Sequence, residues 1–267
     1  MFDVNNYFII FVLTIIFFLL SYLGATVGLI LGDIRLPLLI YALQSTTNTI
    51  GIATGTNLAT SAMGAFASTY CHIKEGRVDF RLLCAIGIPS GLGAFIGMIV
   101  FAHVNTDWMK IVIGILLVYS GFQIVNAKKA IQGEYQRAYW KKLLFEILIG
   151  VALGVLSGAV GLMLGSIRLP AMIQVLGVEP KEAVGTNVAL NFITASIGAI
   201  TSVFTLKSYS LFHLPLIVSL MIATLVGSYL GAQSLKKINT STLCKILAWV
   251  LSGTGTFMIL ENLHSFS

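Results

Sequence analysis

Charge is scarce in this sequence, and its scarcity excludes an ordinary soluble protein. Only 10% of the 267 residues are charged, whereas 57% are hydrophobic. A soluble globular domain carries about 25% charged residues. Uncharged runs cover residues 4–32, 82–106, 183–206 and 208–235, and each exceeds the roughly 20 apolar residues that cross a bilayer as a helix. The sequence therefore predicts an all-α polytopic membrane protein of the plasma membrane, with the lipid bilayer as its surroundings.

Residues that carry metal or catalytic chemistry are equally few. The three cysteines show no CxxC spacing, and the four histidines, His72 among them, form no cluster, so we expect no metal site and no cofactor. Asp33 is the only carboxylate that we place in the apolar interior. The sequence contains no HExxH motif and no nucleotide-binding motif, which argues against an enzyme and against direct ATP coupling.

The chain contains an internal duplication. The stretch GLILGDIRLP at 28–37 returns as GLMLGSIRLP at 161–170. The triplet Gly-Thr-Asn at 55–57 returns at 185–187, and glycines at 93 and 97 return at 227 and 231 with a spacing that favours close helix packing. Because the order is kept, we divide the chain into a first transmembrane repeat, 1–127, a basic cytoplasmic linker, 128–142, and a second transmembrane repeat, 143–267. Together they form one integrated domain.

Each repeat is predicted to begin with a broken helical hairpin. The segments after the motifs, 36–43 and 169–178, are too short to cross a bilayer, so each hairpin leaves on the side that it entered. Three spans follow near 56–73, 82–102 and 110–127, and again near 185–205, 211–234 and 243–260, which gives 8 to 10 membrane segments. The helix breaks are assigned to Gly28, Gly32, Pro37, Gly161, Gly165 and Pro170. Each proline is expected in the first turn of a new helical segment.

Lysine and arginine predict how the repeats are oriented. If each repeat crosses three times, one side of the membrane receives Lys74, Arg77, Arg81, Lys128, Lys129, Arg137, Lys141, Lys142, Lys181, Lys236, Lys237 and Lys245. Only Lys110 and Lys207 fall on the other side, apart from the motif arginines. Since cytoplasmic connections hold the excess, both chain termini are predicted to be extracytoplasmic and the repeats to be inverted. This topology explains the net charge of +6 without a nucleic-acid partner.

The two motif arginines are the first candidates for binding a substrate. Arg35 and Arg168 occupy equivalent positions, and an arginine within the membrane costs at least about 2.5–3.5 kcal/mol on insertion scales. Guanidinium groups bind oxyanions through two parallel hydrogen bonds. Asp33, whose counterpart is Ser166, is expected to offset one arginine and is the candidate for carrying a coupled proton. In the alternative interpretation the hairpin tips reach only the interface, where the arginines extend toward headgroups and Asp33 caps a turn.

The two Gly-Thr-Asn triplets add uncharged donors. Each precedes an apolar run, so we expect each to start a helix whose first N–H groups attract anions. The alternative is an ordinary N-cap beside a glycine that permits close packing. The candidate substrate-binding residues are Arg35, Arg168, Thr56, Asn57, Thr186, Asn187, Ser61 and Asn191.

These motifs are similar to those of the sulfite exporter TauE/SafE family. The resemblance spans nearly the whole chain and rests on the two broken-helix motifs, on the stretch GTNLATSAMGAFASTYCHIKEGRVDFRLL and on GLMLGSIRLPAMIQVLGVEPKEAVGTN. Where family members usually show three glycines in a row, this chain keeps only Gly32 and Gly165. The resemblance implies an inverted-repeat fold and transport of a sulfur-containing anion such as sulfite, a sulfonate, sulfoacetate or thiosulfate.

Three functions fit the residues. The leading hypothesis is a secondary transporter, with export as the direction that the resemblance implies. A passive anion channel would use the same residues, and a membrane scaffold or sensor would carry no flux. The sequence indicates no oligomeric state.

Overall fold

The fold is all-α and polytopic, as predicted. The computed structural model describes residues 7–26, 28–43, 49–101, 106–126, 139–174, 176–205 and 214–234, and separate residues between 245 and 260. The helices in these stretches are α1 (Tyr7–Ala25), α2 (Gly32–Ala42), α3 (Thr49–Lys74), α4 (Phe80–Phe101), α5 (Thr106–Asn126), α6 (Tyr139–Val160), α7 (Gly165–Gln174), α8 (Pro180–Thr205) and α9 (Leu214–Ser234). Most of the predicted linker, the last predicted span in part, and Lys207, Lys236 and Lys237 lie outside the described residues.

Within the described residues, five helical stretches are long and apolar enough to cross a membrane. They are Tyr7–Ala25, Phe80–Val100, Leu143–Val160, Lys181–Thr205 and Leu214–Ser234. Large apolar side chains point outward from them, among them Leu92, Phe95 and Ile99 of α4. An exposed surface of this kind is stable in lipid and unfavourable in water.

The two motifs interrupt the helices where the glycines predict. Between α1 and α2, Gly28 has a φ of +72°, and between α6 and α7, Gly161 has a φ of +75°. Only glycine adopts this backbone region readily. A β-carbon on Gly28 would also overlap Val184, and one on Gly161 would overlap Thr54. Each break therefore depends on glycine for both conformation and space.

The helices that return from the breaks are short. α2 has 11 residues and α7 has 10, or about 15 Å at 1.5 Å per residue, half of a bilayer core. Contrary to prediction, Pro37 and Pro170 do not start them: α2 begins at Gly32 and α7 at Gly165. A proline inside a helix leaves the carbonyl four residues earlier without its helical partner. Those carbonyls belong to Asp33 and Ser166.

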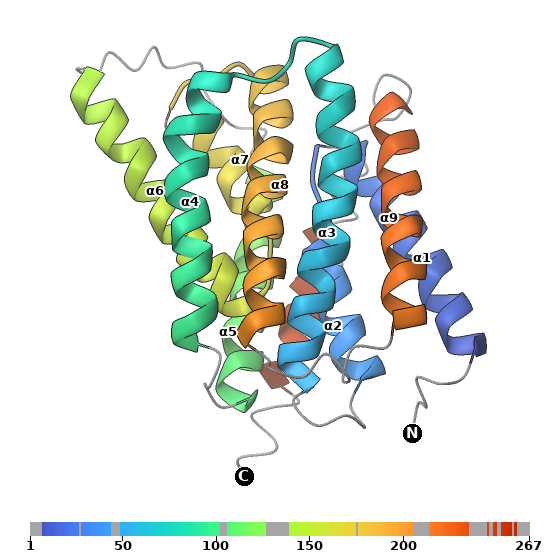
Figure 1. Ribbon diagram of the computed structural model, residues 1–267. Coiled ribbons are helices and arrows are strands. Elements are labelled where there is room, and N and C mark those ends of the chain that lie inside the picture. The colour runs from blue at the N-terminus through green and yellow to red at the C-terminus, as the bar shows by residue number, and fades with distance from the viewer. Residues whose placement is uncertain are drawn as a thin grey trace.

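Close helix pairs join the two repeats. α4 packs on α6, α1 on α9, and α3 on both α8 and α9, an arrangement visible in Figure 1. The GxxxG glycines lie at two of these contacts, as predicted. A β-carbon on Gly97 would overlap the carbonyl oxygen of Val155 in α6, and one on Gly231 would overlap that of Tyr22 in α1. In each case the helix that leads into one hairpin is held by the other repeat.

The arrangement of the ends agrees with the charge count. In Figure 1, α1 begins at the lower right and α6 at the upper left, so the helices that lead into the motifs approach from opposite ends. The α3–α4 turn and the start of α8 lie at the upper end, which holds Lys74, Arg77, Arg81 and Lys181. The inversion of the repeats across a membrane stays a prediction, which this arrangement supports.

Candidate functional site

The two hairpins meet through equivalent residues. The hydroxyl of Ser166 donates to Oδ2 of Asp33 at 2.9 Å, and both side chains are buried. Each is the second residue of its helix, α2 or α7. The contact therefore joins the two breaks at the centre of the protein, next to the carbonyls that the prolines leave without helical partners.

The asparagines of the Gly-Thr-Asn triplets bind the opposite break. Asn57 of α3 donates from Nδ2 to the carbonyl of Gly161 at 2.8 Å. Asn187 of α8 lies near the carbonyls of Gly165, at 3.3 Å, and Gly28, at 3.5 Å. Irregular backbone within a membrane needs such donors, because lipid provides none. Asn57 thereby stabilises the helix break of the other repeat, and Asn187 lies against both breaks.

Arg35 is enclosed by protein groups. Its guanidinium lies near the hydroxyls of Ser61, at 3.2 Å, and Ser21, at 3.4 Å. Its Nε donates to the carbonyl of Leu31 at 3.3 Å. The ring of Phe17 lies 5.5 Å from the guanidinium carbon, within the range of a cation–π interaction. Its exposed fraction is 1%, so Arg35 does not extend toward headgroups.

Arg168 is equally buried but has few partners. Its exposed fraction is 0%, and its only hydrogen bond among the described residues is a long one, 3.5 Å, to the carbonyl of Met163. Nε and Nη1 have no partner there. The residues 133 positions after Phe17 and Ser21 are Gly150 and Gly154. The second repeat therefore lacks two side chains that satisfy Arg35 in the first.

Unused polar atoms surround the junction. Asn191, the counterpart of Ser61, is fully buried, and neither atom of its amide group has a hydrogen-bond partner in the described structure. Its Nδ2 lies so close to Gly165 that a β-carbon there would be 2.7 Å away. The Oδ1 atoms of Asp33, Asn57 and Asn187 also have no hydrogen-bond partner among the described residues. Buried polar atoms normally have hydrogen-bond partners, so this group of atoms without partners indicates a site for a ligand or for water.

One expectation about these residues is wrong, and two others, substrate contact by Thr186 and the offset of an arginine by Asp33, stay predictions. The triplets do not start helices: α3 begins at Thr49 and α8 at Pro180, so the triplets lie in the second and third turns of these helices. The hydroxyl of Thr186 accepts the backbone N–H of Asp79 at 2.9 Å and holds the α3–α4 turn. Within the described residues, no ion pair of 4 Å or less joins Asp33 to Arg35. Thr56 is buried, and its role stays a prediction.

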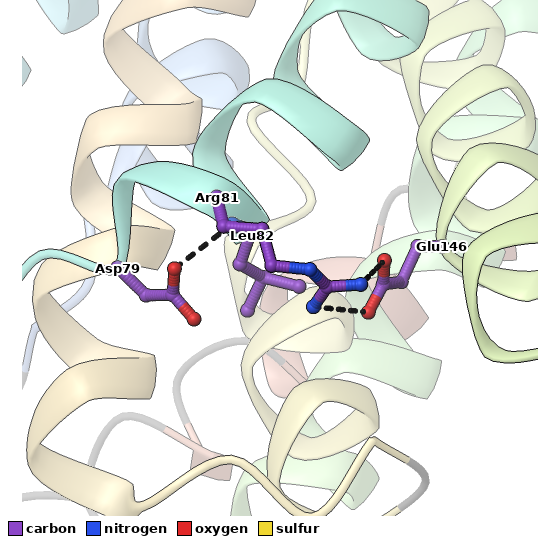
Figure 2. Close-up of polar contacts among 4 residues, drawn as sticks. All are labelled: Asp79, Arg81, Leu82 and Glu146. Atoms are coloured by element: carbon purple, nitrogen blue, oxygen red, sulfur yellow. Dashed lines mark hydrogen bonds and ion pairs between the residues drawn. The ribbon is translucent and has the colours of Figure 1, made fainter. Parts of the chain in front are cut away.

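A second buried carboxylate was missed. Figure 2 shows the side chain of Arg81, at the start of α4, paired with Glu146 of α6. The two contacts measure 3.3 and 3.1 Å, and Glu146 is fully buried. Asp33 is therefore not the only interior carboxylate. The apolar flanks of Glu146, in LLFEILIG, were the signal that could have found it. The same view shows Asp79 accepting the N–H of Leu82, at 3.0 Å, in the first turn of α4.

No group of three or more His, Cys, Asp or Glu side chains that could hold a metal ion occurs among the described residues. The site is built from arginine, asparagine, serine and one aspartate. That set suits hydrogen bonding to an anion.

Comparison with known families decides the class of the protein. The family described as sulfite exporter TauE/SafE matches residues 13–258. The chain belongs to this family. As a TauE/SafE member it is a membrane transporter, and the resemblance noted in the motifs is confirmed.

Bacterial relatives of this TauE/SafE protein carry the same general description. The probable membrane transporter protein YunE of Bacillus subtilis is 26% identical over 262 residues, which is 91% of this chain and 94% of the relative. A probable membrane transporter protein of Haemophilus influenzae is 22% identical over 262 residues, covering 93% and 94%. YdhB of Bacillus subtilis is 25% identical over 196 residues, covering 69% and 74%. No solved structure matches the chain.

Proposed function

We propose that this protein is a secondary transporter that exports a small sulfur-containing oxyanion, bound at Arg168 between the two helix breaks. The observation that carries the proposal is the state of Arg168. It is fully buried, two of its three guanidinium nitrogens have no partner within the described structure, and no acidic group lies within 4 Å of it there.

The energetics favour an anionic ligand. A buried donor without a partner costs about 1–3 kcal/mol, and more when it is charged. An oxyanion would satisfy Nε and Nη1 together, in the two-bond geometry that a guanidinium presents. Asn191, whose Nδ2 has no partner among the described residues, would add a neutral donor. Asp33 beside Ser166 would limit the net positive charge and so favour release of the anion over permanent binding.

The chemical class of the substrate comes from the family description, which names sulfite. Sulfite, sulfonates, sulfoacetate and thiosulfate share a sulfur oxyanion group, which can accept two parallel N–H hydrogen bonds from a guanidinium. The same description supports export. We place the upper end of Figure 1, with the α3–α4 turn, in the cytoplasm and both termini outside, because that end collects the basic residues. Asp33 is the candidate for proton coupling within the anion site itself.

The proposal is tested by flux measurements on the purified full-length chain in proteoliposomes. Radiolabelled sulfite, sulfoacetate, thiosulfate and sulfate are each loaded inside, and exchange against unlabelled anion outside is followed. We expect saturable exchange of at least one sulfur oxyanion. Ohmic currents without saturation would instead identify an anion channel, and absence of any anion-dependent flux would identify a scaffold or sensor.

A further inference from the structure

Small and polar side chains form a stripe along α3, from the arginine site to the α3–α4 turn. The stripe consists of Ser61, Ala65, Ser68 and His72. Their spacings of four, three and four residues place them on one face of the helix. All four are buried. Because Ser61 contacts Arg35 at 3.2 Å, one end of this stripe belongs to the site described above.

His72 lies at the other end and has no role in that site. Its exposed fraction is 1%. Neither Nδ1 nor Nε2 has a hydrogen-bond partner in the described structure, and the same is true of the hydroxyl of Ser68, one helical turn earlier. Buried ring nitrogens and hydroxyls that the fold leaves without partners are available to a ligand.

Two charged groups that act on His72 are partly exposed to solvent. Glu75 and Arg77 in the α3–α4 turn form a 2.6 Å ion pair with side chains 37% and 16% exposed, and both act electrostatically on the ring. The helices packed on α3 are α2, α8 and α9. Their ionisable groups are Asp33, Arg35 and Tyr41 of α2, Lys181 and Glu182 of α8, and Tyr229 of α9. Asp33 and Arg35 lie at the arginine end of the stripe, and Lys181 and Glu182 are exposed.

The second repeat lacks an ionisable group at the matching position. The residues 130 positions later in α8 are Asn191, Ala195, Gly198 and Ser202. The hydroxyl of Ser202 is already bonded to the carbonyl of Ala199 at 2.7 Å. A buried ionisable group therefore occurs at this position in α3 and not at the equivalent position in α8.

We propose that His72 is the proton-binding site through which anion transport is coupled to a pH difference. The inference rests on the proposed function. A histidine exposed to water changes its charge near neutral pH, whereas burial and Arg77 favour the neutral ring of His72 in this structure. Ionisable groups buried in membrane proteins mark proton paths. At 1.5 Å per residue, His72 lies about 16 Å along α3 from Ser61. The proton therefore binds away from the Ser61 end of the stripe, and Ser68 lies between His72 and Ser61.

The test compares the native chain with His72→Gln and with the matched control Ser202→Ala, all in proteoliposomes with radiolabelled sulfite. Exchange is measured with sulfite on both sides and no gradient, and accumulation is measured under an imposed difference of about one pH unit. With one proton per anion, that difference sustains about tenfold accumulation. We expect His72→Gln to keep exchange and lose accumulation, and Ser202→Ala to keep both.

The outcomes separate this inference from the proposed function. Accumulation by His72→Gln at the native level overturns the role of His72 alone, as does loss of accumulation in Asp33→Asn but not in His72→Gln. Absence of exchange by the native chain of every sulfur oxyanion tested above overturns the proposed function and the inference with it, and if another anion than sulfite is exchanged, that anion replaces sulfite in this test. If His72→Gln does not fold, a pH-sensitive dye inside native vesicles decides: sulfite movement without proton movement overturns the inference.

Discussion

Arg35 and Arg168 occupy the same position in two copies of one motif, and their surroundings differ. Arg35 lies against two serine hydroxyls, a carbonyl and an aromatic ring. Arg168 is as deeply buried, yet two of its nitrogens have no partner among the described residues. The difference arises from neighbours on other helices. Gly150 and Gly154 of α6 occupy the positions that Phe17 and Ser21 hold in α1.

The comparison shows how a duplicated motif can acquire two roles. Identical residues are copied together, but their partners are changed one at a time on α1 and α6. We infer that Arg35 in the first copy stabilises the fold, whereas Arg168 in the second copy binds the ligand. The following predictions test this division.

Arg168→Gln is expected to have the largest effect on transport. Hydrogen bonds to a charged group contribute about 1.5–3 kcal/mol, so the apparent affinity for the anion should fall about 10- to 100-fold. The free energy of unfolding should not fall, because the substitution removes a buried charge without a partner. Exchange rates and thermal unfolding in detergent measure the two effects. Arg168→Lys keeps the positive charge but loses the paired N–H donors of the guanidinium. Its transport rate should therefore lie between those of Arg168→Gln and the native chain.

Exchanging Asp33 and Ser166 tests the junction between the copies. Asp33→Ser removes the carboxylate, and Ser166→Asp places two carboxyl groups at a distance where both cannot ionise. We expect each single variant to lose about tenfold in exchange rate, the equivalent of one charged hydrogen bond. The double variant restores a serine–carboxylate pair and should regain most of the rate. Equal loss in all three variants would contradict the idea that the pair acts as a unit.

Arg35→Gln should act mainly on stability. It removes the partner of Ser21 and Ser61 and leaves their buried hydroxyls less well satisfied, at a cost of about 1–3 kcal/mol in the free energy of unfolding. Folded protein that remains should still exchange anions. Thermal unfolding and exchange, measured on the same preparation, give the comparison with Arg168→Gln. A reversed pattern in the two variants would assign the ligand to Arg35.

The glycine contacts should produce the smallest effects on transport. Gly97→Ala and Gly231→Ala introduce overlap with a backbone carbonyl, and overpacking costs about 1–3 kcal/mol. Gly253→Ala is the control, because among the described residues no atom outside its own stretch of helix lies within 4 Å of a β-carbon built there. The free energy of unfolding of this variant should change by no more than about 0.5 kcal/mol. Similar decreases in the free energy of unfolding for Gly97→Ala and Gly231→Ala would show that the two contacts between the repeats are equally tightly packed.

Much of the architecture could be predicted from the sequence. Apolar run lengths predict the spans, and the repeated motif predicts both hairpins, because glycine and a short return segment leave few alternatives. The helix starts could not be placed this way. α3 and α8 extend through their polar triplets to Thr49 and Pro180, since a backbone inside a membrane must satisfy its own hydrogen bonds whatever its side chains are.

The site could be predicted only as a set of residues. Arg168, Asn187 and Asn191 were found because they recur or adjoin repeated motifs. That Asn57 binds the break of the other repeat depends on contacts across more than 100 residues, which local patterns do not encode. The difference between the surroundings of the two arginines could have been predicted from the sequence. At the 133-residue spacing of the motif, Phe17 and Ser21 align with Gly150 and Gly154.

The cross-repeat packing of α1 has a consequence for how the protein is made. The backbone of Phe18 meets Gly227 of α9, roughly 200 residues later in the chain. At about 5–20 residues per second, the ribosome needs about 10–40 s to synthesise that stretch. During this interval the first helix has no permanent neighbour on that side, and its small residues face lipid or a membrane insertase until the last part of the chain arrives.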